Sequence, residues 1–113
     1  MKKALILAAT GEGLTGLALV LVPSLVGQVL LGEQLTGVAI PVARVAGTAL
    51  IGLSIACWPG SPLAGMLFYS TVVAVYLAYL GLAGGATGVL LWPAVALHFV
   101  LSILLGLGWS RRW

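Results

Sequence analysis

The sequence is poor in charge. Only 6% of its 113 residues are Asp, Glu, Lys or Arg, and aspartate is absent altogether. Soluble domains contain about 25% charged and roughly 45–50% apolar residues, whereas 62% of this chain is hydrophobic. This composition excludes an ordinary soluble domain and a disordered tail. The five Lys and Arg residues are also too few and too dispersed for a nucleic-acid surface, which needs clustered positive charge, so we expect no nucleic-acid partner.

The residues that carry most enzyme chemistry are also scarce. Cys57 is the single cysteine and therefore forms no internal disulfide, which excludes a disulfide-stapled module. His98 is the single histidine, so one chain offers neither two axial haem ligands nor a Cys/His zinc cluster. The chain has no His-Glu-x-x-His, no Gly-x-Ser-x-Gly and no phosphate-binding loop, and a Ser-His-Asp triad lacks its aspartate. We expect a protein that is not an enzyme and that holds no metal or cofactor.

Long apolar runs fill the sequence instead. A transmembrane helix needs about 20 mainly apolar residues to cross ~30 Å of hydrocarbon. Four runs approach that length: Leu5–Val22, Val38–Cys57, Leu63–Leu82 and Gly88–Trp109. They are continuously apolar rather than alternating, which favours helices over barrel strands. The sequence predicts an all-α integral membrane four-helix bundle that forms a single domain over residues 1–113.

The breaks between the runs are rich in proline and glycine. Pro23-Ser24 ends the first run, residues 58–62 (WPGSP) separate the second from the third, and residues 83–88 (AGGATG) separate the third from the fourth. Lys2 and Lys3 precede the first run, and a signal peptide begins in the same way, with positive residues before an apolar stretch. Glu12 interrupts its apolar core, however, and no small-x-small cleavage site follows. We therefore expect this run to be retained as a helix.

Positive residues at the two ends predict the orientation. Lys2 and Lys3 precede the first run, and Arg111 and Arg112 follow the last, whereas Glu33 lies between the first two runs. Four spans place both termini on one side, and the positive-inside rule makes that side cytoplasmic. We expect a multi-pass protein of the inner (plasma) membrane.

The predicted outer loop, residues 23–37, is longer than a minimal turn. Ser24 is placed to cap a short helix, and Gly32 is placed to end it. On a helix, one side would carry four apolar residues: Leu25, Val26, Val29 and Leu30. This pattern predicts a short amphipathic helix in the first outer loop, lying in the membrane interface. The alternative is a lid over the space between the spans.

Four ionisable or polar residues lie inside the runs and form the candidate site. They are Glu12, Arg44, Tyr76 and His98. Counted at 1.5 Å per residue, all four fall in the middle to outer half of the bilayer. A charged side chain at a helix centre raises the free energy of insertion by about 2.5–3.5 kcal/mol, so each charge there needs a partner.

Three interpretations of these residues remain open. In the first, Glu12 and Arg44 form an ion pair that fixes the first two helices in register, with His98 or Tyr76 completing the hydrogen bonds. In the second, the four residues form a polar site for a proton or a small ligand. In the third, they face neighbouring chains of an oligomer. A small residue lies one turn from each polar group, which allows close helix approach.

Part of the chain is similar to the DoxX-like small four-helix bacterial membrane proteins. The similar stretches are Gly16–Pro23 (GLALVLVP), Leu30–Gly32 (LLG) and Ala43–Gly47 (ARVAG), with Leu50 and Gly52 after them. They cover less than half of the chain. Some members look like membrane partners of oxidoreductases that pass electrons to quinone. The resemblance implies an accessory role in the membrane rather than a catalytic one.

The chain also resembles the small multidrug resistance transporters in length and in number of spans. Those proteins carry one membrane glutamate in their first helix that binds protons and cationic substrate, and Glu12 occupies that place. The sequence departs from them in two respects. The aromatic and glycine pattern expected on the third helix is not recognisable, and Arg44 would neutralise the glutamate and repel a cation.

Two functions are therefore predicted. The first is a non-catalytic accessory or structural bundle, in contact with membrane lipid, that self-associates as a homo-oligomer or docks with other membrane subunits. The alternative is a proton-coupled small-molecule transporter that works as a dimer with Glu12 at its centre. An Arg44 side chain paired with Glu12 would favour the first, and an accessible Glu12 with Arg44 turned away would favour the second.

Overall fold

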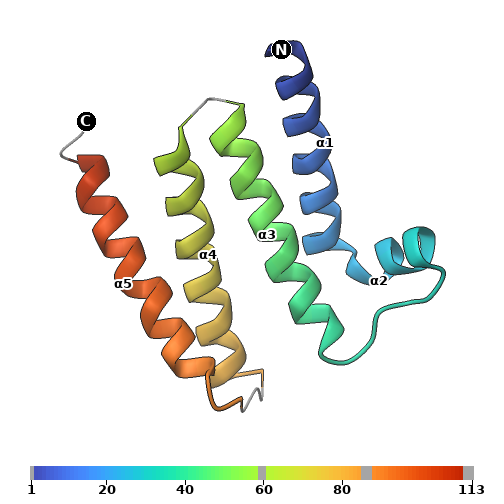
Figure 1. The fold of residues 1–113 in the computed structure, drawn as a ribbon. Helices are drawn as coiled ribbons and strands as arrows, with labels where there is room; N and C mark the ends of the chain where they lie inside the picture. Colours follow the sequence, from blue (N-terminus) through green and yellow to red (C-terminus); the bar gives the residue numbers. More distant parts are fainter. Residues whose placement is uncertain (1, 59–60, 85–87, 111–113) are drawn as a thin grey trace. The chain divides into compact units, whose positions relative to one another are not determined.

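The computed structural model describes residues 2–58, 61–84 and 88–110. Within these ranges the chain is helical and contains no strand. In order along the chain, the elements are α1 (Lys2–Leu21), α2 (Pro23–Val26), a π-helical turn η1 (Gly27–Leu31), α3 (Ala39–Cys57), α4 (Pro62–Leu82) and α5 (Leu91–Ser110) (Figure 1). Some residues used in the sequence analysis lie outside the described ranges. They are Pro59 and Gly60 of the second break, residues 85–87 of the third break, and Arg111 and Arg112.

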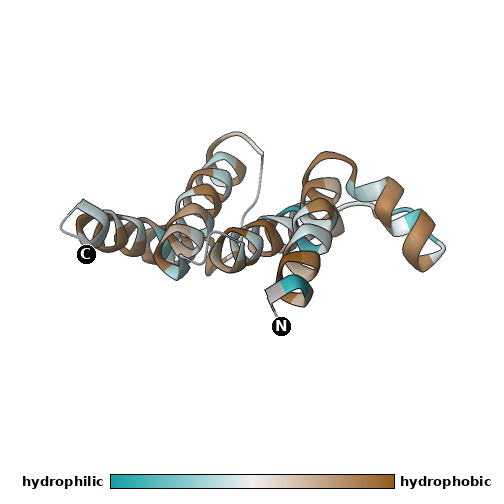
Figure 2. Cartoon of the chain, turned by 90° about the horizontal axis from the view of Figure 1, so that it is seen from above, coloured by the Kyte–Doolittle hydropathy of each residue, from teal (hydrophilic) through white to brown (hydrophobic). Residues whose placement is uncertain are grey.

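The four long helices confirm the four predicted spans. Each is long and apolar enough to cross a membrane over 19 to 21 residues, namely Lys3–Leu21, Ala39–Cys57, Pro62–Leu82 and Leu91–Ser110. At 1.5 Å per residue a helix of this length reaches about 30 Å, the thickness of the hydrocarbon core. Brown, the colour of hydrophobic residues, recurs along each of the four long helices (Figure 2). The chain is therefore a small multi-pass membrane protein.

Burial follows the pattern of a membrane protein rather than a soluble one. The buried side chains of the described residues are small or medium: Ala9, Pro23, Ala43, Thr48, Ser70, Val73 and Ala74. Large apolar side chains point outward instead, for example Leu7 at 73% exposed and Leu82 at 80%. A soluble protein would bury such side chains to remove them from water, whereas lipid tails cover them equally well.

The chain divides into two compact units, Met1–Gly65 and Met66–Trp113, which are described separately. The first holds α1, α2, η1, α3 and the first residues of α4, and the second holds the rest of α4 and α5. The single domain expected for residues 1–113 remains a prediction.

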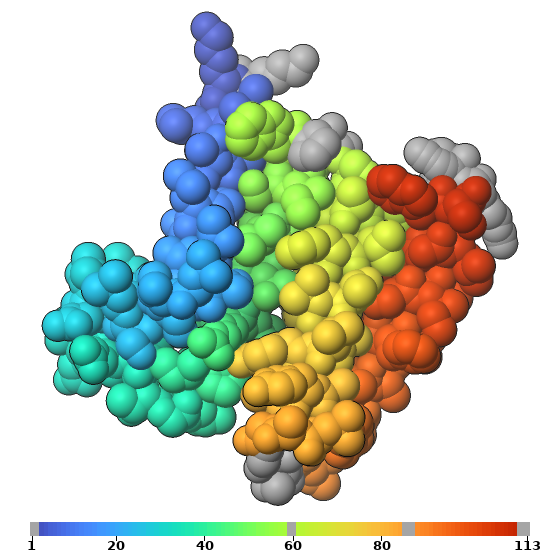
Figure 3. Space-filling view, turned by 180° about the vertical axis from the view of Figure 1, so that it is seen from behind, coloured from blue at the N-terminus to red at the C-terminus, as the bar shows by residue number. Residues whose placement is uncertain are grey.

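In the first unit, α1 and α3 pack along each other in opposite directions (Figures 1 and 3). Gly16 and Gly47 bring the two backbones together, since a Cβ on either would lie only 2.5 Å from the carbonyl oxygen of the other. Further along, the Ser54 hydroxyl donates to the Ala9 carbonyl at 2.7 Å. Small residues at a crossing allow this close approach, which is how helices associate in lipid.

A short helical segment, Pro23–Leu31, follows α1 without a side-chain cap. Proline suits the first turn of a helix because its missing N–H would be unpaired there in any case. The segment ends at Gly32, whose φ of 89° is the left-handed conformation that glycine favours. The expected capping role of Ser24 is wrong: Pro23 already occupies the first position, and the Ser24 hydroxyl donates to the Leu35 carbonyl at 2.9 Å, which ties the segment to the returning chain.

In the second unit, α4 and α5 meet at Gly81 and Trp92. A Cβ on Gly81 would lie 2.6 Å from Cζ2 of Trp92, so the indole ring packs directly on the glycine backbone. Towards the middle of the helices, the rings of Tyr69 and His98 meet edge to face, with centroids 5.8 Å apart. None of the described residues of α5 is buried.

Candidate functional site

The four predicted site residues divide between the two units. Glu12 and Arg44 lie on α1 and α3 of the first unit, and Tyr76 and His98 lie on α4 and α5 of the second.

Arg44 contacts the end of α1. Its Nε donates to the Val20 carbonyl at 3.2 Å, and its side chain is half-buried. The last carbonyls of a helix have no intrahelical partner. Pro23 follows shortly after and has no N–H, so the neighbouring Leu19 carbonyl lacks its backbone donor and the hydrogen-bond ladder of α1 is interrupted in this turn. In lipid an unpaired carbonyl raises the free energy by several kcal/mol, so Arg44 stabilises the junction between α1 and α2.

Glu12 lies near the midpoint of α1, and its side chain is exposed. Within residues 2–58, 61–84 and 88–110 it has no ion pair with Arg44. The register of the two helices explains this separation. Gly16 lies against Gly47 and Ala9 lies close to Ser54, so Arg44 is level with the last turn of α1 rather than with Glu12. Val20 is eight residues from Glu12, about 12 Å along the axis. The structure thus does not bring these two charges together.

Small and polar residues surround Glu12 on the exposed side of α1. Ala8, Gly11 and Thr15 are exposed and lie within one turn of it. A Cβ added to Gly11 would meet nothing within 4 Å. The face of α1 that packs on α3 is a different one, carrying Ala9 and Gly16. We call the set Ala8, Gly11, Glu12 and Thr15 the Glu12 face.

His98 has one ring nitrogen occupied. Its Nδ1 lies 2.8 Å from the Ala94 carbonyl one turn earlier. A carbonyl only accepts, so Nδ1 carries a proton, and in the neutral ring Nε2 is left as an acceptor. The Ser102 hydroxyl donates to the His98 carbonyl at 2.7 Å.

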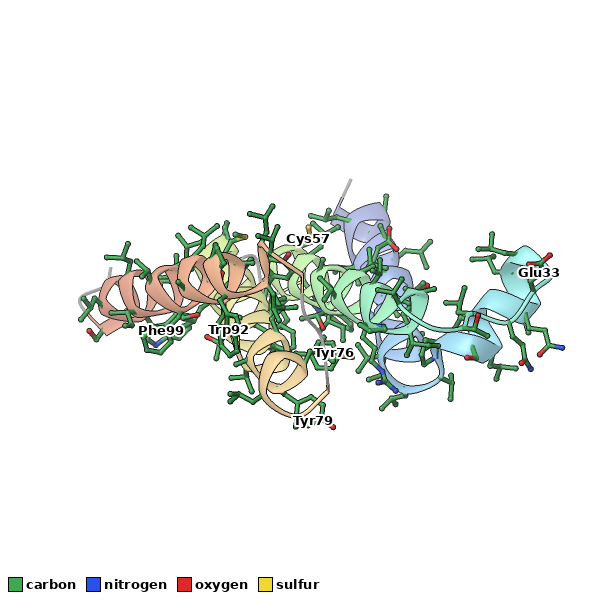
Figure 4. The ribbon with its side chains drawn as sticks, turned by 90° about the horizontal axis from the view of Figure 1, so that it is seen from below. Glu33, Cys57, Tyr76, Tyr79, Trp92 and Phe99 are labelled. Atoms are coloured by element: carbon green, nitrogen blue, oxygen red, sulfur yellow. The ribbon has the colours of Figure 1, made fainter. Side chains whose placement is uncertain are left out.

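The tyrosine that meets His98 is Tyr69 rather than Tyr76. The Tyr69 and His98 rings are inclined at 73°, whereas Tyr76 stacks on Tyr79 of its own helix at 6.5 Å (Figure 4). Tyr69 and Tyr76 are seven residues apart and share a face of α4, so depth was the only sequence signal that distinguished them. Ser70, which the sequence did not single out, is fully buried, and its hydroxyl has no hydrogen-bond partner among the described residues.

The chemistry available from these groups is limited. No group of three or more His, Cys, Asp or Glu side chains that could hold a metal occurs in the described part of the chain. Cys57 is a half-buried free thiol at the end of α3, and Glu33 lies at the tip of the loop beyond η1 (Figure 4). Among the described residues, the first unit offers a carboxylate and a guanidinium that lack an ion-pair partner, and the second offers one imidazole acceptor.

Comparison with known proteins leaves the family open: no family model, no curated protein and no solved structure matches the chain.

Proposed function

We propose that the chain is a non-catalytic membrane protein that self-associates through the Glu12 face. The observation that carries this proposal is the position of Glu12 near the middle of a membrane-spanning helix, exposed and without a partner in the described chain. Charged groups at a helix centre raise the insertion free energy by about 2.5–3.5 kcal/mol, and they almost always face a bundle interior or a water-filled cavity. A second helix against this face would provide such an interior.

A second copy of the same chain fits this face best. In a two-fold interface the same patch meets itself, so the patch must carry both donors and acceptors. Glu12 accepts hydrogen bonds, and the Thr15 hydroxyl, on the same exposed side, donates them. The Glu12 of one copy would reach the Thr15 of the other. Ala8 and Gly11 keep the surface low enough for the helices to approach.

Two glycines provide a matched test of this interface. Gly11 on α1 and Gly106 on α5 both have open space around the position of an added Cβ, so both sites have room for a side chain to begin, and leucine is the test residue at each. We expect native mass spectrometry in a mild detergent to show more than one copy of the wild-type chain per particle. Gly11→Leu should shift the protein to the monomer, whereas Gly106→Leu should not. A wild-type monomer in several mild detergents, or equal effects of the two substitutions, would refute the proposal.

A second candidate, the proton-coupled transporter, is favoured by one specific observation. The Arg44 side chain is turned towards Val20, so the Glu12 carboxylate has no ion-pair partner among the described residues. A free carboxylate in the middle of a span is what exchange between a proton and a cation requires. Glu12→Gln decides between the two functions. A loss of proton flux into vesicles, with an unchanged particle mass, would support the transporter, and the absence of any flux in the wild type would leave self-association alone.

We further propose that the four spans assemble into one bundle with both termini in the cytoplasm, and that the segment Pro23–Leu31 lies in the outer interface of the inner membrane. The apolar side chains of this segment support the second point, since Leu25 is 54% exposed and Val29 79%. Such side chains insert readily among headgroups and the first methylenes of the acyl chains. Blue shift and quenching of a tryptophan placed at Val29, with a depth-dependent quencher, test this position.

A further inference from the structure

The guanidinium group of Arg44 has more donors than the chain satisfies. An arginine side chain carries five N–H donors, and the described residues accept one of them, at the Val20 carbonyl. The whole sequence contains only two acidic side chains, Glu12 and Glu33. Both lie in the described part of the chain, where neither forms an ion pair with Arg44. Among the described residues, this half-buried positive charge therefore has no counter-charge, and four of its N–H groups have no acceptor.

The depth of Arg44 indicates what the missing partner is. Arg44 is the sixth residue of α3, about 7.5 Å from the start of that helix, and it bonds to the next-to-last residue of α1. Both helices are about as long as the hydrocarbon core is thick. The guanidinium thus lies near the boundary of the core, within snorkelling distance of the headgroups. Glu12 of a second copy is a poor partner, because it remains about 12 Å deeper along α1.

We propose that Arg44 binds the phosphate of a phospholipid headgroup at the junction between α1 and α2. A planar guanidinium matches the oxygens of a phosphate with two parallel hydrogen bonds, which a lysine ammonium does not reproduce. Apolar side chains at the same junction provide a surface for the acyl chains, since Leu21 is 65% exposed, Val22 44% and Leu25 54%. The site does not depend on self-association, because it uses residues of one chain outside the Glu12 face.

Native mass spectrometry of the delipidated full-length protein tests the site. Phosphatidylglycerol supplies the phosphate and the acyl chains, whereas diacylglycerol supplies the acyl chains alone. We expect phosphatidylglycerol to bind the wild type at least about tenfold more tightly than diacylglycerol, a typical effect of charge-assisted hydrogen bonds. Arg44→Gln should remove most of this preference, and Arg44→Lys should restore part of it. Lys3→Gln, which removes the same charge at the other end of α1, should keep it.

A measurement on the wild type alone covers the case in which Arg44→Gln does not fold. Phosphatidylglycerol should raise the melting temperature in detergent, and neither diacylglycerol nor inorganic phosphate at millimolar concentration should do so. Equal stabilisation by diacylglycerol would overturn the phosphate site, and equal stabilisation by inorganic phosphate would overturn the lipid as its source. A phosphatidylglycerol preference that survives in folded Arg44→Gln would overturn the role of Arg44.

Discussion

Replacing Gly47 with alanine should force α1 and α3 apart. The new Cβ would lie 2.5 Å from the Gly16 carbonyl oxygen and 2.8 Å from the Cβ of Leu19, and neither atom can rotate away. Ordinary contact begins at about 3.4 Å, so the helices must separate by about 0.9 Å, the difference between these distances. The same movement would lengthen the Ser54–Ala9 contact from 2.7 Å to about 3.6 Å and the Arg44–Val20 contact from 3.2 Å to about 4.1 Å, and both values lie beyond the hydrogen-bond range.

The size of the effect follows from these contributions. Overpacking destabilises by typically 1–3 kcal/mol, and each interhelical hydrogen bond in a membrane contributes about 0.6 kcal/mol. The higher helix propensity of alanine offsets this loss of stability by about 1 kcal/mol. Gly47→Ala should therefore lower the free energy of unfolding by about 1–3 kcal/mol.

Gly106→Ala is the matched control. Its Cβ would meet nothing within 4 Å, so only the propensity gain remains and stability should rise slightly. Reversible unfolding in mixed micelles with increasing SDS, followed by circular dichroism, measures both variants. If Gly47→Ala is as stable as Gly106→Ala, then α1 and α3 do not cross at Gly16 and Gly47, and the reasoning fails.

Three further predictions concern single side chains. Because Glu12 and Arg44 are about 12 Å apart along α1, replacing both with glutamine should give additive changes in stability, within about 0.5 kcal/mol. A rescue in the double variant would instead show that they pair. Ser54→Ala removes the bond to the Ala9 carbonyl and should lower the unfolding free energy by about 0.6–1.7 kcal/mol in the same micelles; an unchanged value would show that the bond contributes nothing. Finally, Glu33→Cys in a cysteine-free background should react with an impermeant maleimide from outside intact cells, and labelling only after lysis would invert the topology.

The spans could be predicted from the sequence because lipid imposes a simple requirement. A run of about 20 apolar residues is needed to cross the core, and proline or glycine marks where each run stops. The predicted run Val38–Cys57 became Ala39–Cys57, and Leu63–Leu82 became Pro62–Leu82. The largest differences are three residues each: the first run starts at Lys2 rather than Leu5, and the fourth starts at Leu91 rather than Gly88. Residues 88–90 are apolar enough to continue a span but form a turn closed by the Leu91 N–H and the Gly88 carbonyl.

The packing faces were much harder to predict. In water, the buried side of a helix is the apolar side, but a helix in lipid is apolar on every side and carries no such signal. Helical spacing places Glu12 and Gly16, four residues apart, on one side of the first span. In the structure Gly16 packs on Gly47, whereas Glu12 lies on the flank and remains exposed. A rotation of α1 about its own axis by less than a quarter turn would decide whether Glu12 meets α3. No pattern of residues in the sequence specified that rotation.

The bond between Arg44 and Val20 also bears on how the protein enters the membrane. When α1 has been made, its last turn still has a carbonyl group at Val20 whose partner is 24 residues further along the chain. At the edge of the hydrocarbon core, that carbonyl gains its arginine partner only after the first turns of α3 arrive. We therefore expect α1 and α3 to insert as a hairpin, with α1 remaining beside the insertion machinery until α3 is complete. The first stable intermediate in biogenesis would then be a pair of helices rather than a single one.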